Sequence, residues 1–386
     1  MPHDVLILGA SARAAAFSAL RSGLRPYCAD YFADRDLAAA CPVHRVDPAH
    51  AARDFLAIAE ALPPSPWFYT GGLENHPELV ERIRRRHRLW GVGAGVLRAV
   101  RDPIRVARVL NEAGIPVPEA RRDGRGLPRD GSWLVKPMAS GGGRGIAPLT
   151  GSASPDSAAD YVQRRIDGPS FSALFLGRGD RARLVGVTRQ WTGIAGAPFA
   201  YRGSLGPWSI GPDLAGRLRT LGDRLTAAFG LVGWFGVDYI LADGLPWPVE
   251  VNPRYPASLE LHELASGCSL LEQHRRACEG GDGEDPLPQE PGVPRPPVLA
   301  KRILYATRRS IVPEIALDGP DHGHGFAVPA ISDVPQPGSR LEPGEPAMTV
   351  WATAAEPAAC RARSIRLERS WRNRLGWPTP MAHGAL

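Results

Sequence analysis

The segment Trp133-Leu134-Val135-Lys136-Pro137 is followed, after two residues, by the glycine-rich run Ser140-Gly141-Gly142-Gly143-Arg144-Gly145. The apolar residues before Lys136 favour a strand, and the consecutive glycines favour a loop. Lys136 is one of two lysines among 46 basic residues, so arginine supplies almost all of the positive charge. An ammonium is a compact charge that can reach one phosphate oxygen, whereas a guanidinium prefers a planar pair of acceptors. The segment therefore indicates either a lysine suited to phosphate or a solvated charge at a strand end.

Length and composition are those of a globular protein with room for two or three domains. The chain has 386 residues, 44% of them hydrophobic and 22% charged, and a formal net charge of +6. The arginines are spread along the sequence. Their densest run, Arg84-Arg85-Arg86-His87-Arg88, ends a helix-like stretch at 77–89, where cations suit the helix dipole. We therefore expect no nucleic-acid partner.

Cysteine usage and hydropathy favour the cytoplasm. The five cysteines are odd in number and form no C-x-x-C pair, which argues against a disulfide framework and against a zinc site. No apolar run approaches the length of a membrane span, and the apolar start Val5–Leu8 is too short for a signal sequence. We expect a cytoplasmic protein without a membrane partner.

Residues 1–100 alternate strand-like and helix-like segments, which is typical of a parallel sheet. Strands are expected at Val5–Leu8, Arg25–Ala29 and Trp67–Thr70, and a helix at Arg13–Ser22. Gly9 marks the first strand-to-helix turn, but the residues after it lack the other glycines of the G-x-G-x-x-G dinucleotide motif. A tight turn accounts for Gly9, so a Rossmann-like domain without NAD is predicted.

Residues 101–280 form a second unit in which helices and strands are mixed. In chain order we expect a helix Asp102–Ala113, a strand Ser132–Val135, a helix near Ser157–Val162, strands Ser170–Leu176 and Arg183–Gln190, a helix Pro212–Phe229, and strands Trp234–Leu241 and Pro248–Val251. A proline- and acid-rich linker is expected at 281–297, before a β-rich C-terminal region at 298–386 that ends in an arginine-rich helix or tail. The predicted fold class is α/β and α+β.

Two carboxylates and an amide are brought together by the last two of these strands. Glu250 and Asn252 are two residues apart on one strand and so project from the same face. Asp243-Gly244 is a hairpin-type turn that folds Asp238 back beside them. Carboxylate and amide oxygens suit Mg²⁺ shared with phosphates, and Arg254 on the same face could hold a phosphoryl oxygen. An unpaired Glu250 within a hydrophobic strand would be costly, which favours this interpretation over a solvated acid.

These motifs, together with the step Gln163-Arg164-Arg165-Ile166-Asp167-Gly168, resemble the ATP-grasp superfamily in their order and spacing. The resemblance covers about residues 100–280 and implies a two-lobed ATP-grasp domain at 101–280. Residues 1–100 resemble the preATP-grasp domain of the family. The most similar branch is a group of predicted ATP-dependent carboligases, which are carboxylate–amine ligases.

The resemblance also implies roles for the site residues. ATP would be bound by Lys136, the loop residues Gly141, Gly142, Gly143 and Arg144, and Gln163 and Ile166 at the adenine. One or two Mg²⁺ ions, with Mn²⁺ as an alternative, would be held by Asp238, Glu250 and Asn252. Arg254 would steady an acyl phosphate, acting in catalysis together with Lys136.

One position departs from the family pattern. Family members usually place an earlier lysine after an aspartate at the start of this unit, and here Pro103 follows Asp102. Either Arg105 or Arg101 is expected to supply the missing charge. If neither does, the chain would be an inactive relative.

Two further segments are candidates for substrate contacts. Residues 70–77 follow a parallel strand, at the edge where such sheets bind ligands, and they offer Glu74 and Asn75. A capped helix start is the alternative interpretation. Residues 201–207 offer Arg202 on a loop that would face the substrate, and here the alternative is an irregular hairpin.

The sequence therefore predicts an ATP- and Mg²⁺-dependent ligase that converts a carboxylate into an acyl phosphate and joins it to an amine or similar nucleophile. Phosphoryl transfer of this kind depends on positioning and charge neutralisation more than on a protein nucleophile. The expected partners are small-molecule carboxylate and amine substrates, and a homo-oligomer is left open. The alternatives are a kinase or carboxylase that uses the same nucleotide site, and a non-catalytic ATP-binding protein.

Overall fold

The computed structural model describes residues 3–378, apart from 152–154, 157, 282–296 and 318–324. Parallel and antiparallel sheets are both present, which confirms the predicted α/β and α+β class. The predicted linker at 281–297 lies outside the described residues except at its two ends. No helix within the described ranges is long and apolar enough to cross a membrane.

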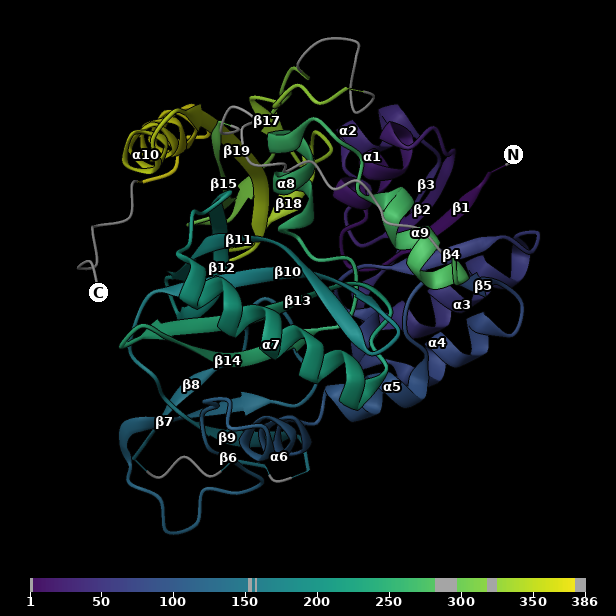
Figure 1. The fold of residues 1–386 in the computed structure, drawn as a ribbon. Helices are drawn as coiled ribbons and strands as arrows, with labels where there is room; N and C mark the ends of the chain where they lie inside the picture. Colours follow the sequence, from purple (N-terminus) through teal and green to yellow (C-terminus); the bar gives the residue numbers. More distant parts are fainter. Residues whose placement is uncertain (1–2, 152–154, 157, 282–296, 318–324, 379–386) are drawn as a thin grey trace.

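The N-terminal part, purple to blue in Figure 1, contains a five-stranded parallel sheet in the order β3-β2-β1-β4-β5. Its strands are β1 (Val5–Leu8), β2 (Pro26–Asp30), β3 (Val43–Arg45), β4 (Pro66–Tyr69) and β5 (Arg88–Leu89). Its helices are α1 (Arg13–Arg21), α2 (Arg35–Ala40), α3 (Ala51–Ala61), α4 (Pro77–Arg84) and α5 (Ala94–Val100), with 3-10 turns η1 (Pro48–His50) and η2 (Leu73–Asn75). The all-apolar strand β1 lies at the centre of the sheet and is fully buried, as predicted for a Rossmann-like domain.

A four-stranded sheet in the order β6-β9-β7-β8 follows, next to α6 (Pro103–Glu112). Its strands are β6 (Ala120–Arg121), β7 (Asp130–Pro137), β8 (Ala147–Thr150) and β9 (Asp160–Arg164). The predicted helix near 157–162 is wrong, because β9 is an interior strand that pairs with β7 and β6. A stretch this short gains little as an isolated helix, whereas pairing on both sides satisfies its backbone groups.

The largest sheet has eight strands, in the order β14-β13-β10-β11-β12-β15-β19-β17. The strands are β10 (Ser170–Arg178), β11 (Arg181–Ile194), β12 (Ala197–Gly206), β13 (Gly233–Ala242), β14 (Leu245–Asn252), β15 (Val298–Tyr305), β17 (Ile331–Ser332) and β19 (Pro346–Ala354). A separate pair is formed by β16 (Ser310–Ile311) and β18 (Arg340–Leu341). Strands from the predicted C-terminal region therefore extend the sheet that also carries the candidate site.

Helix α7 (Pro212–Phe229) lies across the large sheet in Figure 1. Its buried residues recur at helical spacing and include Leu218, Leu221, Leu225 and Phe229, so one stripe packs on the sheet. Gly230 ends the helix with a left-handed φ of 69°. The remaining helices are α8 (Leu259–Ser266), α9 (Leu271–Glu279) and α10 (Pro357–Arg374), of which α10 packs on β15 and β19.

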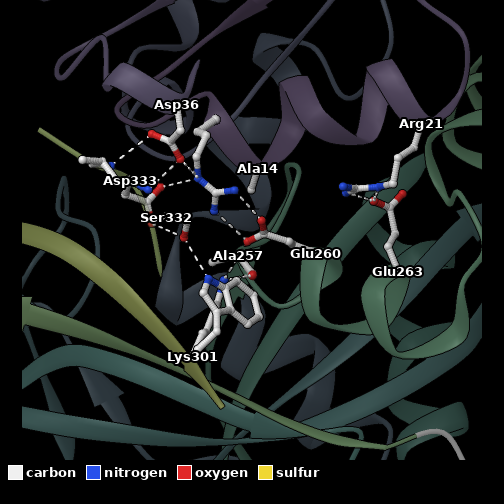
Figure 2. A network of polar contacts seen from close by, with 12 residues as sticks. Ala14, Arg21, Asp36, Ala257, Glu260, Glu263, Lys301, Ser332 and Asp333 are labelled. Atoms are coloured by element: carbon white, nitrogen blue, oxygen red, sulfur yellow. Dashed lines mark hydrogen bonds and ion pairs between the residues drawn. The ribbon is translucent and has the colours of Figure 1, made fainter. Parts of the chain in front are cut away.

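A buried ionic network joins α1 of the N-terminal part to α8 and to the segment after β17 (Figure 2). Arg13 is 2% exposed and donates from its two Nη atoms to Glu260, at 2.6 and 2.9 Å. Its Nε donates to Asp333 at 2.6 Å. We call these residues, with Asp36 and Lys301, the Arg13 network.

Asp36 and Lys301 complete the Arg13 network. Both carboxylate oxygens of Asp36 on α2 accept backbone N–H groups, from Asp333 at 2.9 Å and from Val334 at 3.0 Å. Lys301 on β15 lies 3.7 Å from Glu260 and donates to a backbone carbonyl on the loop before α8. The network therefore fixes the N-terminal part against the far half of the large sheet.

Candidate active site

A cavity that is partly open to solvent lies between the four-stranded sheet, the α5–α6 connection and β14. Its lining residues from α5 and α6 are Val100, Arg101, Pro103 and Val106; those from the small sheet and its loops are Val117, Lys136, Pro137, Met138, Ser140, Gly143, Ile146, Tyr161 and Gln163; and those from β14 are Pro248, Val249, Glu250 and Val251. The lining combines an apolar slot with a few convergent polar groups, as small-molecule sites usually do.

Lys136 extends from the end of β7 into this cavity and is 7% exposed. Its Nζ donates to Gln163 Oε1 at 3.0 Å and to the Val249 carbonyl at 3.1 Å. It also lies 5.6 Å from the centre of the Tyr161 ring. The solvated-charge alternative is therefore wrong, and the ammonium is held at a fixed point in the cavity wall by neutral acceptors.

Arg101, rather than Arg105, occupies the cavity. Arg101 follows α5 and donates to Glu250 Oε1 at 2.8 Å, to Asn75 Oδ1 at 3.1 Å and to the Ser140 carbonyl at 3.1 Å. Arg105 is exposed, and its guanidinium lies over the Phe229 ring on α7, 5.6 Å from the ring centre. Arg105 projects from α6 toward α7, so its charge lies outside the cavity.

The strand pair β13–β14 brings Asp238, Glu250 and Asn252 together. Asp238 is paired with Glu250 across the two strands, and Gly236 is paired with Asn252. The Asn252 amide donates to Asp238 Oδ2 at 3.1 Å. The turn at Asp243, which has a left-handed φ of 51°, closes the hairpin that sets this register.

Arg254 connects this group to the N-terminal part. Its Nη2 donates to Asn252 Oδ1 at 3.2 Å, and its Nε donates to Glu74 Oε1 at 2.7 Å. Glu74 belongs to η2, directly after β4, and its side chain is 1% exposed. The predicted substrate residues Glu74 and Asn75 therefore contact Arg254 and Arg101, so both lie at the candidate site.

The glycine-rich loop rests on β12 and on the C-terminal region. The Gly142 carbonyl accepts from the Tyr201 N–H at 2.8 Å, and Arg144 donates to the Gly344 carbonyl at 3.0 Å. Gly143 has a φ of +71°, and a Cβ at this position would lie 2.0 Å from the Phe199 carbonyl oxygen. This backbone approach requires glycine. Of the loop residues, Ser140 and Gly143 line the cavity.

The two facing carboxylates have opposite pKa shifts. Burial, followed by repulsion from Glu250, raises the pKa of Asp238 to about 6. Burial would also raise the pKa of Glu250, but Arg101 and then Lys136 outweigh it and hold that pKa below its ordinary value. Both groups are therefore mainly ionised at neutral pH, and their repulsion is not fully relieved by the protein.

The donor set of this site fits a magnesium ion shared with phosphates. Mg²⁺ commonly takes one or two carboxylates and completes its shell with phosphate oxygens and water. Within the described ranges, no group of three or more His, Cys, Asp or Glu side chains is placed to hold a metal. Asp238 and Glu250, with the Asn252 amide, would therefore supply part of a coordination shell and leave the rest to a ligand.

Besides Arg105, two further predicted site residues lie outside the cavity. Residues 201–206 belong to strand β12 and do not form the predicted loop. Arg202 donates to Glu368 on α10 at 2.6 Å, which is an ion pair within the fold and a correction to its predicted position. Ile166 follows β9 and does not line the cavity. Its predicted backbone contact with adenine stays a prediction.

The sequence interpretation missed Tyr161, Ser172 and Gln190. Tyr161 lies beside Lys136 in the cavity, and both Ser172 and Gln190 hydrogen-bond Asp238, the latter at 3.0 Å. A signal was present, because Ser170 and Ser172, and then Thr188 and Gln190, place polar side chains at alternate positions of apolar strands. Such alternation marks one polar face on a sheet that is otherwise buried.

Residues 100–258 match the sequence model of the ATP-grasp domain. This match identifies an ATP-grasp domain within residues 100–258 and confirms the resemblance of that region inferred from its motifs. The match spans the small sheet and strands β10 to β14 of the large sheet. It therefore includes Lys136, Asp238, Glu250 and Arg254.

Relatives by sequence are distant. An uncharacterized protein of Methanocaldococcus jannaschii is 23% identical over 370 residues, which cover 89% of this chain and 87% of that protein. The carbamoyl phosphate synthase large chain of Neisseria meningitidis serogroup B is 23% identical over 257 residues, which cover 60% of this chain and 23% of that protein.

Solved structures show a similar fold over almost the whole chain. The biotin carboxylase domain of a Hydrogenobacter thermophilus 2-oxoglutarate carboxylase has a TM-score of 0.69 at 12% identity, covering 92% of this chain and 87% of that one. An L-amino acid ligase of Bacillus licheniformis has a TM-score of 0.67 at 15% identity, covering 96% and 98%. N5-carboxyaminoimidazole ribonucleotide synthetase of Thermus thermophilus has a TM-score of 0.62 at 16% identity, covering 98% and 99%. At these identities the likeness concerns the fold.

Proposed function

We propose that this protein is an ATP- and Mg²⁺-dependent ligase that activates a carboxylate as an acyl phosphate and joins it to an amine or similar nucleophile. The ATP-grasp match and the ligases among the similar structures support an ATP-dependent enzyme. The observation that carries the proposal is the cavity in which Lys136 and Arg101 converge on Glu250 and its partner Asp238.

The chain's residues suit each part of an ATP site. The apolar walls formed by Val106, Val117 and Ile146 would hold the adenine, next to Gln163. Lys136 and Arg101 would donate to phosphate oxygens, and the glycine loop would cover them with backbone N–H groups. Mg²⁺ bound at Asp238 and Glu250 would neutralise the phosphate charge.

The proposed reaction has two steps. The γ-phosphorus of ATP forms a bond to a substrate carboxylate oxygen as its bond to ADP breaks, which gives an acyl phosphate. The amine then attacks the acyl carbon, phosphate leaves with the electron pair of the C–O bond, and the amine gives up a proton. Arg254, which donates to Asn252 Oδ1 at 3.2 Å, would donate to the oxyanion that develops in the second step.

Residues of the N-terminal part are proposed to complete the part of the site that binds the substrate carboxylate. Glu74 and Asn75 hold Arg254 and Arg101 respectively, so a change of partner at either residue would move a positive charge toward a substrate carboxylate. The Arg254–Glu74 pair is almost fully buried, which keeps this charge in place until a ligand enters.

Product analysis with pooled carboxylates and amines tests the proposal. Wild-type protein with Mg²⁺ and ATP should release ADP and phosphate when a suitable pair of substrates is present. Glu250→Gln should lower this rate by at least about 100-fold, because one charged ligand is lost from the phosphate site. Glu342→Gln is the matched control, since Glu342 pairs with Arg309 on the surface and should leave the rate unchanged.

Release of AMP and pyrophosphate would contradict the acyl phosphate route. A stable phosphorylated product would favour the kinase alternative, and strict dependence on bicarbonate would favour the carboxylase alternative. ATP binding without phosphate release from any substrate pool would favour a non-catalytic ATP-binding protein. Sedimentation analysis of the same sample would decide whether the chain forms a homo-oligomer.

A further inference from the structure

Asp238 is also held by residues that do not line the cavity. Gln190 on β11 donates from Nε2 to Asp238 Oδ1 at 3.0 Å. The other end of the Gln190 amide is held by the Ser170 hydroxyl on β10, which donates to its Oε1 at 2.8 Å. With Oε1 accepting from Ser170, the Nε2 group faces the carboxylate.

The reverse orientation of the Gln190 amide is disfavoured by its contact with Asp238. It would place the amide oxygen against an ionised carboxylate, which offers only acceptors. The Ser170 hydroxyl can donate or accept, so it is the carboxylate of Asp238 that selects the orientation present. Ser170, Gln190 and Asp238 therefore form a chain with one direction of donation, which we call the Gln190 chain.

The Gln190 chain leaves lone pairs of Asp238 available. Oδ1 accepts from Gln190 and Oδ2 accepts from Asn252 at 3.1 Å, while the Ser172 hydroxyl also bonds this carboxylate. A carboxylate has about four acceptor sites, so the three donors fix its plane and do not saturate it. The remaining acceptor site of Asp238 is free for a cation, and Glu250 faces Asp238 across the two strands.

We propose that Gln190 is a positioning residue that holds Asp238 in the orientation required by the divalent cation of the ATP site, and that Ser170 fixes the Gln190 amide. This inference rests on the proposed function. Hydrogen bonds to a carboxylate ligand set its direction, and the loss of such a partner commonly weakens metal binding by about 10–100-fold. Gln190 itself does not line the cavity, so its proposed role is exerted through Asp238.

Binding of Mn²⁺ to the full-length protein in the presence of ADP, followed by electron paramagnetic resonance, tests the proposal without any need for turnover. Gln190→Leu has a similar size and removes the donor, and it should weaken Mn²⁺ binding by about 10–100-fold. Ser170→Ala leaves Gln190 in place but frees its amide, so a smaller loss of about 2–5-fold is expected.

Thr188→Val is the matched control. Thr188 lies two residues before Gln190 on the same strand, is fully buried, and its hydroxyl has no hydrogen-bond partner among the residues that the structure describes. This variant should bind Mn²⁺ as the wild type does. In turnover, a raised Mg²⁺ concentration should restore most of the rate of Gln190→Leu, which a merely structural defect would not allow.

The outcomes separate this inference from the proposed function. If the wild type binds no Mn²⁺ in the presence of ADP, the ATP site itself is contradicted, and the inference with it. If the wild type binds Mn²⁺ and Gln190→Leu binds it equally well, the positioning role alone is overturned. If Gln190→Leu fails to fold, Ser170→Ala decides, and unchanged Mn²⁺ affinity in that variant overturns the proposal.

Discussion

The two lysines of this chain are both buried, but one has a charged partner and the other has neutral hydrogen-bond acceptors. Lys301 belongs to the Arg13 network, where it lies 3.7 Å from Glu260, whose two oxygens also accept from Arg13 (Figure 2). Lys136 lies in the cavity and donates to two neutral oxygens, those of Gln163 and Val249. Lys301 therefore lies in an ion pair, whereas the hydrogen-bond acceptors of Lys136 are neutral and its charge lowers the pKa of Glu250.

The carboxylates of the two regions differ less than the lysines do. Each region has one carboxylate whose pKa is held below its ordinary value by nearby cations, Glu260 in the Arg13 network and Glu250 at the candidate site. Each also has one whose pKa is raised, chiefly by burial, Asp36 in the Arg13 network and Asp238, to about 6, at the candidate site. The regions are separated by access, because Glu250 lines a cavity, whereas the Arg13 network is buried between parts of the fold.

The largest expected effect is on the Arg13 network. Arg13→Met leaves Glu260 and Asp333 buried without their main partner, which should lower the free energy of unfolding by about 3–5 kcal/mol. Domains of this kind are stable by about 5–15 kcal/mol, so the loss should be plain in urea unfolding curves. If Arg13→Met does not fold, Arg13→Lys keeps the charge without the planar fork and should show an intermediate loss.

Arg25→Met is the control for this prediction. Arg25 also pairs with an aspartate, Asp4, but its side chain is 63% exposed. Solvent and salt screen an exposed pair of this kind, so a much smaller loss than for Arg13→Met is expected. Equal losses of unfolding free energy in Arg13→Met and Arg25→Met would show that the buried network stabilises the protein no more than a surface pair does.

Sequence reasoning could not have found the Arg13 network. Arg13 and Asp333 are 320 residues apart, and each reads as an ordinary surface charge until the parts of the chain are packed together. By contrast, β1 and α7 have the predicted bounds because their patterns are local, a short all-apolar run and an apolar stripe at helical spacing. The grouping of Asp238 with Glu250 was also predictable, because a single hairpin turn sets it.

The next prediction tests whether Arg101 or Arg105 supplies the charge that the family usually takes from a lysine. Arg101→Ala should lower ATP-dependent phosphate release by about 100-fold, because it removes the donor that reaches Glu250 and Ser140 in the cavity. Arg105→Ala should leave the rate within about twofold, since its side chain lies on Phe229 outside the cavity lining. Initial rates at saturating Mg²⁺ measure both.

Arg101→Lys sharpens the same comparison. It introduces the residue type that the family usually carries but cannot reach three acceptors with one planar group. A rate between those of Arg101→Ala and the wild type is expected. A large loss in Arg105→Ala together with normal turnover in Arg101→Ala would place the missing charge on α6 after all.

The smallest expected effect concerns Arg202, which the sequence placed at the substrate and the structure places against α10. Arg202 is 26% exposed and shares Glu368 with Arg302 at 3.2 Å and Arg372 at 3.1 Å. Glu368 therefore keeps two cations when Arg202→Gln removes the third, and a loss of about 1 kcal/mol in unfolding free energy is expected. The KM for ATP and for the carboxylate found by product analysis should stay within about twofold. An increase of KM by about tenfold at unchanged stability would instead show that the Arg202 guanidinium leaves Glu368 for the substrate, and would extend the charged part of the site along β12.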